Sequence, residues 1–290
     1  MIDWTEIDDQ ISIAIHAEFQ HGNVRPLGGG DSNQAWHLHG KDHRQFLVKI
    51  NAVNRLDMFA AEQAGLEAIA ATNTIRVPKP VTAGSAGANS FLVLEFLDMS
   101  GRGDAQALGK QLAAMHRSTA SQFGWHRNNT IGLTPQPNSW TSGWQEFWRE
   151  QRLGHQLEEA ARNGYRGQLQ ALGKQVLDAL PELLGDHQPS PSLLHGDLWS
   201  GNHAYLRNDT PVIFDPATYY GDRETDIAMT ELFGGYPAAF YSAYQAAWPL
   251  DAGYARRKPL YNLYHVLNHC NMVSSSYVQQ AESIMRKLLN

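Results

Sequence analysis

The sequence predicts an α+β protein of two lobes, an N-terminal antiparallel sheet lobe over residues 1–98 and a mainly helical lobe over residues 99–290. Three observations support this prediction. Strand-like runs bounded by turn residues are concentrated before residue 98, helical periodicity dominates after residue 105, and the stretch 98–103 is rich in turn residues. With 290 residues, the chain can bury one large or two smaller hydrophobic cores.

In the N-terminal lobe, some stretches have apolar residues at the spacing of a helix and others at the spacing of a strand. The predicted elements are a helix over 5–19, strands over 35–39 and 45–50, a helix over 54–71 and a buried strand over 91–97. The proline-containing stretch 77–80 prevents the second helix from continuing. In the strand that ends at Ile50, alternation places Lys49 on the face opposite Val48 and Ile50.

Helical patterns follow in the second lobe. Predicted helices lie over 105–118, 144–161 and 168–184, and further helices follow from about Glu231. The stretch 132–138 contains a glycine and two prolines and is predicted to be a loop. A mainly helical lobe therefore follows a small mixed one.

The composition is that of an ordinary globular protein. Apolar residues make up 42% and charged residues 18% of the chain, and the net charge of −6 argues against nucleic acid as the main partner. The acidic N-terminus shows no signal segment, and no apolar run is long enough to cross a membrane. Cys270 is the only cysteine, so an internal disulfide is excluded. We expect a monomeric, cytoplasmic protein without a nucleic-acid or membrane partner.

A polar segment over 192–217 has the residue spacing of a phosphoryl-transfer site. Asp197 and Asn202 are five positions apart, and Asp215 ends a short apolar run. In kinases, an aspartate that accepts a hydroxyl proton precedes a Mg²⁺-binding asparagine by five positions, and a second metal-binding aspartate follows. Each residue taken singly is more typical of a hydrogen-bonded turn. The triple spacing favours the catalytic interpretation.

Lys49 is a candidate for neutralising nucleotide phosphates. In kinases, a strand lysine held by a glutamate of the following helix has this role. Glu62 is the preferred partner, because Phe59 and Leu66 share its helix face, and Glu67 is the competing partner. The alternative interpretation is a solvated strand lysine.

The glycine-rich stretch 28–33 is a candidate phosphate-binding loop. Glycines let backbone N–H groups approach phosphate oxygens, and we assign nucleotide binding to the backbone of Gly29, Gly30, Ser32 and Asn33. The pattern G-x-G-x-x-G is not completed, because Asn33 occupies its last position. An ordinary hairpin turn is the alternative.

Several segments together resemble the fructosamine kinase (ketosamine 3-kinase) family, in the aminoglycoside phosphotransferase-like branch of the protein-kinase-like fold. The resemblance spans nearly the whole chain. The segments that support it are LLHGDLWSGN (193–202), FDPATYYGDRETDIAMTELFGG (214–235), IGLTPQPN (131–138), QEFWREQRL (145–153) and LYNLYHVLNH (260–269).

This resemblance implies that the chain uses ATP and Mg²⁺ to phosphorylate the 3-hydroxyl of a ketosamine sugar. Phosphorylation destabilises the adduct and lets the amine be recovered, which is a deglycation role. The resemblance also implies that Asp197 is the base, that Asn202 and Asp215 bind Mg²⁺, and that Lys49 and Glu62 clamp the phosphates.

Further contacts follow from the same resemblance. The backbone of Glu95, Phe96 and Leu97, at the end of a strand, would form the hinge that receives adenine. Trp199 would face the sugar, and the carboxylates of Glu224 and Asp226 would brace the catalytic loops.

Two alternatives remain open. The first is a kinase of the same fold that acts on another small hydroxyl substrate, such as a sugar, a choline-like amino alcohol or an aminoglycoside. The catalytic residues do not separate these substrates, because they contact only ATP and the attacking oxygen. The second is a catalytically silent binding module, against which the intact Lys49, Asp197, Asn202 and Asp215 argue.

Overall fold

A computed structural model describes residues 2–28 and 33–290 and divides into two compact units. The first unit comprises Met1–Asp104 together with Ala204–Asp215, and the second comprises Ala105–His203 and Pro216–Asn290. The segment Ala204–Asp215 is thus grouped with the N-terminal part of the chain, which no local pattern indicated. The predicted limits at residues 98 and 99 stay a prediction.

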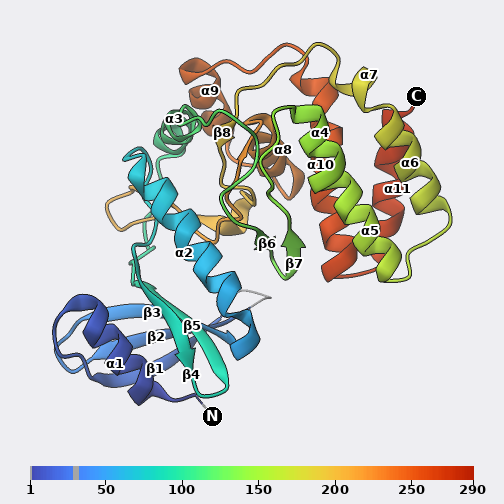
Figure 1. Cartoon of the computed structure of the whole chain (residues 1–290). Helices are drawn as coiled ribbons and strands as arrows, with labels where there is room; N and C mark the ends of the chain where they lie inside the picture. The colour runs from blue at the N-terminus through green and yellow to red at the C-terminus, as the bar shows by residue number, and fades with distance from the viewer. Residues whose placement is uncertain (1, 29–32) are drawn as a thin grey trace. The chain divides into compact units, whose positions relative to one another are not determined.

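The first unit is built on a five-stranded antiparallel sheet with the order β1-β2-β3-β5-β4 (Figure 1). Its strands are β1 (His21–Leu27), β2 (Gln34–Gly40), β3 (Gln45–Ala52), β4 (Pro80–Ala86) and β5 (Asn89–Glu95). On β3, Val48 and Ile50 are buried with the hydrophobic core of this unit. Lys49 lies on the other face, where it pairs with Ala35 of β2 and Leu92 of β5.

Two helices accompany this sheet. Ile7 and Ile11 of α1 (Trp4–Ile15) are fully buried in one core with Leu38 of β2. The helix predicted to reach residue 19 ends earlier, because His16 adopts a left-handed conformation with φ of 53° and caps it. α2 (Leu56–Ala71) lies close to its predicted range and follows a short 3₁₀ turn over Val53–Arg55.

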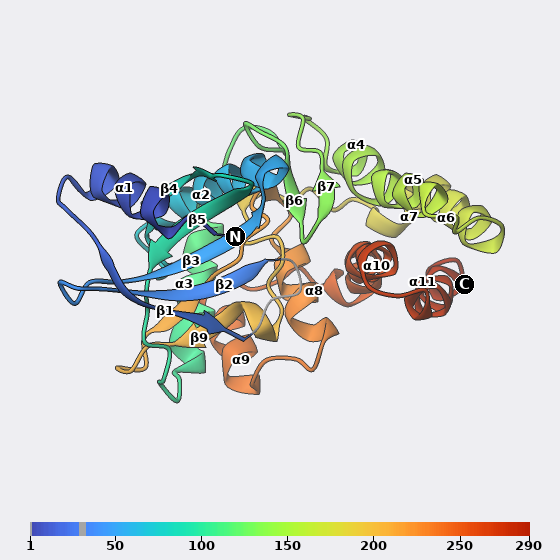
Figure 2. The same cartoon turned by 90° about the horizontal axis from the view of Figure 1, so that it is seen from below.

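The second unit is mainly helical, as predicted. Its helices are α3 (Ala105–His116), α4 (Trp144–Trp148), a π-helical turn (Arg149–Gly154), α5 (His155–Arg162), α6 (Gln168–Asp178), α7 (Leu180–Leu184), α8 (Glu224–Leu232), α9 (Ala238–Ala247), α10 (Tyr254–Met272) and α11 (Ser276–Leu288). Figure 2 shows α10 and α11 side by side, viewed along their axes. The α+β class with an antiparallel sheet and a helical second part is therefore confirmed.

Short strand pairs frame the polar segment. The pairs are β6 (Asn129–Ile131) with β7 (Thr134–Gln136), β8 (Ser192–Leu193) with β11 (Tyr220–Gly221), and β9 (His203–Tyr205) with β10 (Pro211–Ile213). The predicted loop over 132–138 is therefore partly strand, because a tight turn returns the chain onto β6. A 3₁₀ turn over Ser200–Asn202 ends the stretch that contains Asp197.

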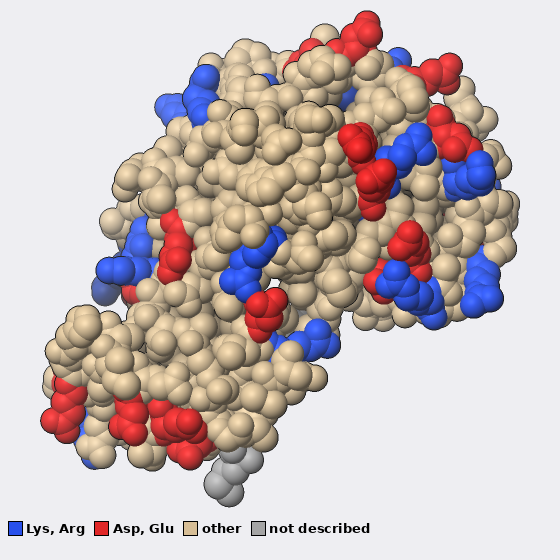
Figure 3. Space-filling model, viewed as in Figure 1, with Lys and Arg blue, Asp and Glu red and all other residues tan. Residues whose placement is uncertain are grey.

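The surface carries charges of both signs. On the face shown in Figure 3, Lys and Arg side chains are interspersed with Asp and Glu side chains rather than gathered into one basic surface. Among the helices that the structure describes, none has the length and apolar composition needed to cross a membrane.

The contact between α3 and α9 gives the first prediction. A Cβ atom added at Gly109 would lie 2.4 Å from the carbonyl oxygen of Phe240 and 3.0 Å from the nitrogen of Tyr244. Both are backbone atoms, so Gly109→Ala is expected to lower the free energy of unfolding by about 1–3 kcal/mol despite the better helix propensity of alanine. Urea unfolding followed by tryptophan fluorescence measures this loss.

Gly143→Ala is the matched control, because the nearest atom to its added Cβ is 3.8 Å away. That variant should lose at most about 1 kcal/mol, through the helix N-cap that Gly143 occupies. Equal stability of Gly109→Ala and the wild type would show that α9 can shift away at no cost.

Candidate functional site

A buried lysine with two carboxylates forms the polar centre of the first unit. The Nζ atom of Lys49 on β3 donates to Glu62 Oε1 of α2 at 2.5 Å and to Asp215 Oδ1 at 2.6 Å. Glu67 instead accepts a hydrogen bond from Gln63 at an exposed position of α2. The structure thus brings Lys49 together with Glu62 and Asp215, and not with the competing Glu67.

The ammonium group and the two carboxylates of this cluster shift one another's pKa and differ in their exposure to solvent. Burial acts to lower the pKa of Lys49, but the carboxylates of Asp215 and Glu62 outweigh burial and raise this pKa above its usual value. Burial and the Asp215 carboxylate raise the pKa of Glu62, because two carboxylates compete for one ammonium group. The side chain of Lys49 is 8% exposed and that of Asp215 is 43% exposed. A permanent cation therefore holds an aspartate that still faces solvent.

Asp215 also adopts an unusual backbone conformation. Its φ angle is 58°, in the left-handed region that non-glycine residues seldom occupy. Such a conformation costs of order 1 kcal/mol and occurs at functional sites as well as at turns and helix caps. The backbone at Asp215 is thus compatible with the functional interpretation of its carboxylate.

Asp197 and Asn202 lie together in the second unit. The amide nitrogen of Asn202 donates to the Asp197 carbonyl oxygen at 2.8 Å and lies 3.4 Å from Asp197 Oδ2. Since its nitrogen is turned toward Asp197, Asn202 presents its Oδ1 atom away from this contact. The backbone nitrogen of Asp197 donates to His195 Nδ1 at 3.2 Å. The five-residue spacing therefore folds the two side chains into one loop.

A glycine makes this loop possible. Gly196 has a φ angle of 84°, and an added Cβ atom would lie 2.1 Å from the carbonyl oxygen of Ala217. Ala217 in turn donates its backbone N–H to the carbonyl of His195 at 2.8 Å. Only glycine combines this conformation with such a close approach, so Gly196 fixes the chain immediately before Asp197.

The carboxylate of Asp226, at the buried side of α8, anchors the same loop. Its oxygens accept the backbone N–H groups of His195 at 2.7 Å and Gly196 at 2.8 Å, and the ring of His116 lies 3.1 Å away. Burial acts to raise the pKa of Asp226, but His116, His195 and the backbone N–H of Gly196 lower it below its usual value. Asp226 therefore stays ionised beneath the loop that presents Asp197.

Glu224 does not fill the bracing role expected for it. Its two carboxylate oxygens accept hydrogen bonds from the Arg257 guanidinium of α10, each at 2.8 Å. The sequence could not show this pairing, because 33 residues separate the partners.

The predicted hinge residues differ in what they offer. The backbone N–H of Glu95 donates to the Lys79 carbonyl at 2.8 Å, and the Glu95 carboxylate pairs with Arg76. The Phe96 ring is stacked on the imidazole of His37, with centroids 3.8 Å apart and planes inclined by 9°. The N–H of Glu95 is thus already used within the protein, and the assignment of Glu95, Phe96 and Leu97 to the adenine hinge stays a prediction.

His37, whose ring is stacked on Phe96, was not among the site residues predicted from the sequence. Its ring, whose pKa burial lowers, contacts Gln45 Oε1 at 2.8 Å. Alternation along β2 could have revealed it, because His37 lies two positions from Ala35, the partner of Lys49.

Of the remaining predicted residues, some lie outside the described part of the chain, and Asn33 and Trp199 lie within it. Gly29, Gly30 and Ser32 lie outside the described residues. The side chain of Asn33 accepts a hydrogen bond from Asn51 Nδ2 at 2.8 Å. Trp199 is 41% exposed, its ring covers Gly201, and its carbonyl accepts the Tyr236 hydroxyl at 3.0 Å. Trp199 thus offers an aromatic surface to solvent in the loop of Asp197.

A buried polar network supports the chain that follows Asp215. Gln136 of β7 donates to the Ala217 carbonyl at 3.1 Å and accepts the hydroxyl of Tyr264 at 2.5 Å. Arg152, which is fully buried, donates to Asn138 Oδ1 at 2.8 Å. Sequence reasoning missed Arg152, although it lies four positions after Trp148, on the buried side of the helix. The segment 131–138 is thus tied to the core of the second unit.

Comparison with known proteins agrees over the whole chain. The family model described as fructosamine kinase matches residues 3–290. A probable ketoamine kinase of Synechocystis is 49% identical over 290 residues, which cover 99% of this chain and 97% of that protein. A chloroplastic protein-ribulosamine 3-kinase of Arabidopsis thaliana is 44% identical over 266 residues, which cover 90% of this chain and 81% of that protein.

A solved structure shares the fold. The crystal structure of a candidate fructosamine-3-kinase from Haemophilus somnus 129PT has a TM-score of 0.91 and 30% sequence identity. The match covers 99% of this chain and 98% of the chain in that crystal structure. The protein-kinase-like fold inferred from the sequence is therefore confirmed.

The anchoring carboxylate gives the second prediction. Asp226→Asn should lower the free energy of unfolding at pH 7 by about 3 kcal/mol, because the amide cannot accept all the bonds that the carboxylate accepts. A carboxylate whose pKa is depressed on folding stabilises the protein above the pKa of the unfolded chain, and this stability is lost as the pH falls through the folded pKa. The difference between wild type and variant should therefore shrink below about pH 4.

Urea unfolding at pH 7 and at pH 3.5 or so measures both effects. Asp178→Asn is the control, since Asp178 is paired with Lys174 at an exposed position of α6 and its pKa is also lowered. This control should not change stability measurably. An Asp226→Asn deficit that stays constant down to acid pH would contradict the assignment.

Proposed function

Because the chain belongs to the fructosamine kinase family, we propose that it transfers the γ-phosphoryl group of ATP to the sugar 3-hydroxyl of a ketosamine. The observation that best supports this chemistry is the Lys49 ammonium held between Glu62 and the half-exposed Asp215. The similarity to a probable ketoamine kinase and to a protein-ribulosamine 3-kinase supports the acceptor. Phosphorylation of this hydroxyl destabilises the adduct, so the reaction serves to recover glycated amines.

The residues fit Mg²⁺ and nucleotide phosphates. Mg²⁺ prefers hard oxygen ligands and is usually held by one or two protein groups together with phosphates and water. The exposed Asp215 carboxylate and the Oδ1 atom of Asn202 are such groups. Bound Mg²⁺ would neutralise charge on the phosphates, and ATP supplies the group that is transferred. Lys49 adds a fixed positive charge beside Asp215.

Asp197 is proposed to accept the proton of the attacking hydroxyl. Its side chain is half-buried in a loop that Gly196 and Asp226 hold in place. Phosphoryl transfer depends mainly on positioning and charge stabilisation, so a carboxylate held in a fixed loop is well suited to orient the acceptor. Trp199, two positions later, offers an exposed ring face on which a sugar can stack.

The proposal extends to partners and setting. We infer a glycated small molecule as substrate and a monomeric, cytoplasmic enzyme. Neither nucleic acid nor a membrane has a part in the proposed reaction.

Removal of the base tests the mechanism. Asp197→Asn keeps the size of the side chain and the loop, but it removes the proton acceptor, so kcat should fall by about 10²- to 10⁴-fold. Thermal stabilisation by Mg-ATP should persist, because the cluster of Lys49, Glu62 and Asp215 is unchanged. A coupled assay for ADP measures kcat.

Ser200→Ala is the control in the same loop, since its hydroxyl is exposed and lies 3.5 Å from the Phe233 carbonyl. This variant should keep kcat within a few-fold of the wild type. Wild-type turnover in Asp197→Asn would refute the assignment of the base.

An acceptor screen tests the substrate. The purified chain with ATP and MgCl₂ should release ADP with a fructosamine or a ribulosamine, and NMR should locate the new phosphate on the 3-oxygen. The kcat/KM should exceed that for choline, a simple sugar or an aminoglycoside by roughly tenfold or more. A preference for one of these other acceptors would replace the ketosamine in the proposal. Binding of Mg-ATP without ADP release on any acceptor would indicate a silent binding module.

A further inference from the structure

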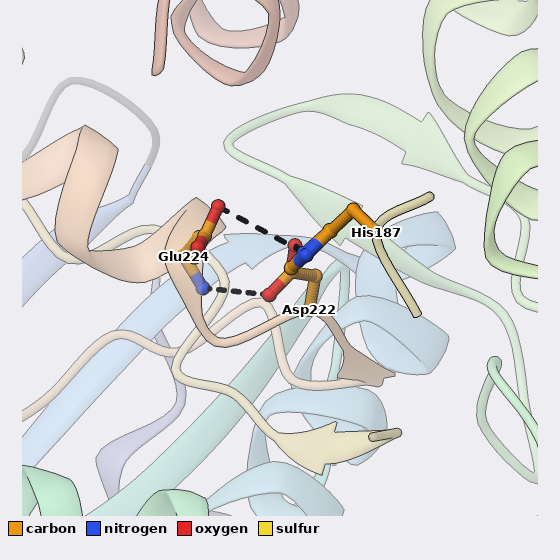
Figure 4. A group of neighbouring side chains, drawn as sticks. All are labelled: His187, Asp222 and Glu224. Atoms are coloured by element: carbon orange, nitrogen blue, oxygen red, sulfur yellow. Dashed lines mark hydrogen bonds and ion pairs between the residues drawn. The ribbon is translucent and has the colours of Figure 1, made fainter. Parts of the chain in front are cut away.

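Three side chains of the second unit converge away from the residues assigned to phosphoryl transfer. His187 follows α7, Asp222 precedes α8, and Glu224 is the first residue of α8. Figure 4 shows the three side chains directed toward one another. Asp222 and Glu224 are 1% and 2% exposed, and the side chain of His187 is 10% exposed. Two buried carboxylates and an imidazole thus meet at one place.

The spacing of their ligand atoms suits a metal ion. His187 Nε2 lies 2.7 Å from Asp222 Oδ2 and 3.9 Å from Glu224 Oε2, and the three atoms lie within 4.8 Å of one another. Bonds of about 2.1 Å to a central ion place ligand atoms roughly 3–4 Å apart. Side-chain adjustments of up to roughly 1 Å would bring the three atoms to that spacing. Within residues 2–28 and 33–290, this is the one such group of three His, Cys, Asp or Glu residues.

The group borders a cavity that contains an unsatisfied hydroxyl. The cavity has a volume of about 250 Å³ and is lined by His187, Asp222 and Glu224 together with Ser192 of β8. Ser192 is 1% exposed, yet its Oγ atom has no hydrogen-bond partner among the described residues. Buried hydroxyl groups are nearly always bonded, so an unpaired one that lines the same cavity as the three ligand residues indicates a missing partner. An ion or its bound water would satisfy this hydroxyl.

The charges around the cavity favour a dication. Arg257 is shared between Glu224 and Asp251, and the Asp222 carboxylate adds a further negative charge. With Asp186 and Arg223, which also line the cavity, four carboxylates stand against two guanidinium groups, an excess of two negative charges. Arg223, which also lines the cavity, donates to the Tyr244 hydroxyl and to backbone carbonyls and not to these carboxylates.

Neighbouring groups hold the ligands in place. The Tyr261 hydroxyl donates to Asp222 Oδ2 at 2.5 Å, and the backbone nitrogen of Glu224 donates to Asp222 Oδ1 at 3.0 Å. Arg257 fixes the Glu224 carboxylate through two bonds of 2.8 Å. Such partners behind the ligands are typical of metal sites, where they fix the orientation of each donor.

We propose that His187, Asp222 and Glu224 bind one divalent transition-metal ion of the Zn²⁺ type, with Ser192 bonded to the ion or to its water. A nitrogen donor beside two carboxylates suits Zn²⁺, Mn²⁺ or Co²⁺ better than Mg²⁺, which prefers oxygen ligands only. The ion would join the segment before β8 to the start of α8. It is a structural ion, separate from the Mg²⁺ that accompanies ATP.

Metal titration of the full chain tests this site. After treatment with a chelator, and without nucleotide, the protein should bind one equivalent of Zn²⁺ in calorimetry, and Co²⁺ should give a visible absorption band. His187→Gln should weaken Zn²⁺ binding by at least about tenfold, and Ser192→Ala should weaken it by a smaller factor. Zn²⁺ should raise the Tm of the wild type but not that of His187→Gln.

Two controls separate this site from other sources of binding. His126→Gln removes an exposed histidine of the same unit and should leave the Zn²⁺ affinity unchanged. Asp215→Asn removes the carboxylate assigned to Mg²⁺ and should also leave the Zn²⁺ equivalent in place. If His187→Gln fails to fold, the Co²⁺ spectrum of Ser192→Ala against wild type provides the comparison. Absence of binding by the wild type at about 100 μM Zn²⁺ overturns the proposal, as does equal binding by wild type and His187→Gln.

Discussion

One buried carboxylate, that of Asp226, determines where the loop that contains Asp197 lies in the second unit. An ionised carboxylate without partners is too costly to bury, so each of its oxygens requires donors. The donors are the backbone N–H groups of His195 and Gly196, the two residues before Asp197. The two backbone bonds that satisfy the buried charge therefore also position Asp197, the proposed base, and movement of the loop would cost Asp226 both of these donors.

The same charge organises the side chains behind it. His116 lies between the two groups, with Nε2 3.1 Å from Asp226 Oδ2 and Nδ1 2.8 Å from the Tyr244 hydroxyl. The Tyr244 oxygen accepts in turn from Arg223 Nη1 at 3.0 Å. α3, α8 and α9 are thereby linked by polar contacts as well as by apolar packing.

The sequence predicted what depends on local spacing and missed what depends on distant partners. β3 and β5 were predictable because buried runs form them, whereas the edge strands β1 and β4 have mostly half-buried or exposed side chains and no alternating pattern. Asp197 and Asn202 form one loop because five residues separate them. The sequence also predicted that Lys49 would be held by Glu62. Arg152 and His187 were missed, because their polar partners lie 14 and 35 positions away in the sequence.

The contacts of segment 131–138 explain why similarity to a family predicts the type of reaction better than it predicts the acceptor substrate. Gln136 contacts the Ala217 carbonyl, and Arg152 secures the neighbouring Asn138 while its guanidinium lies 3.9 Å from the centre of the Tyr219 ring. These buried contacts fix the backbone around the reacting groups and reach no solvent. A residue that selects among acceptors must instead be exposed, as Trp199, the proposed sugar contact, is. Differences in acceptor among relatives are therefore expected at such exposed positions, while the buried network holds the catalytic loop.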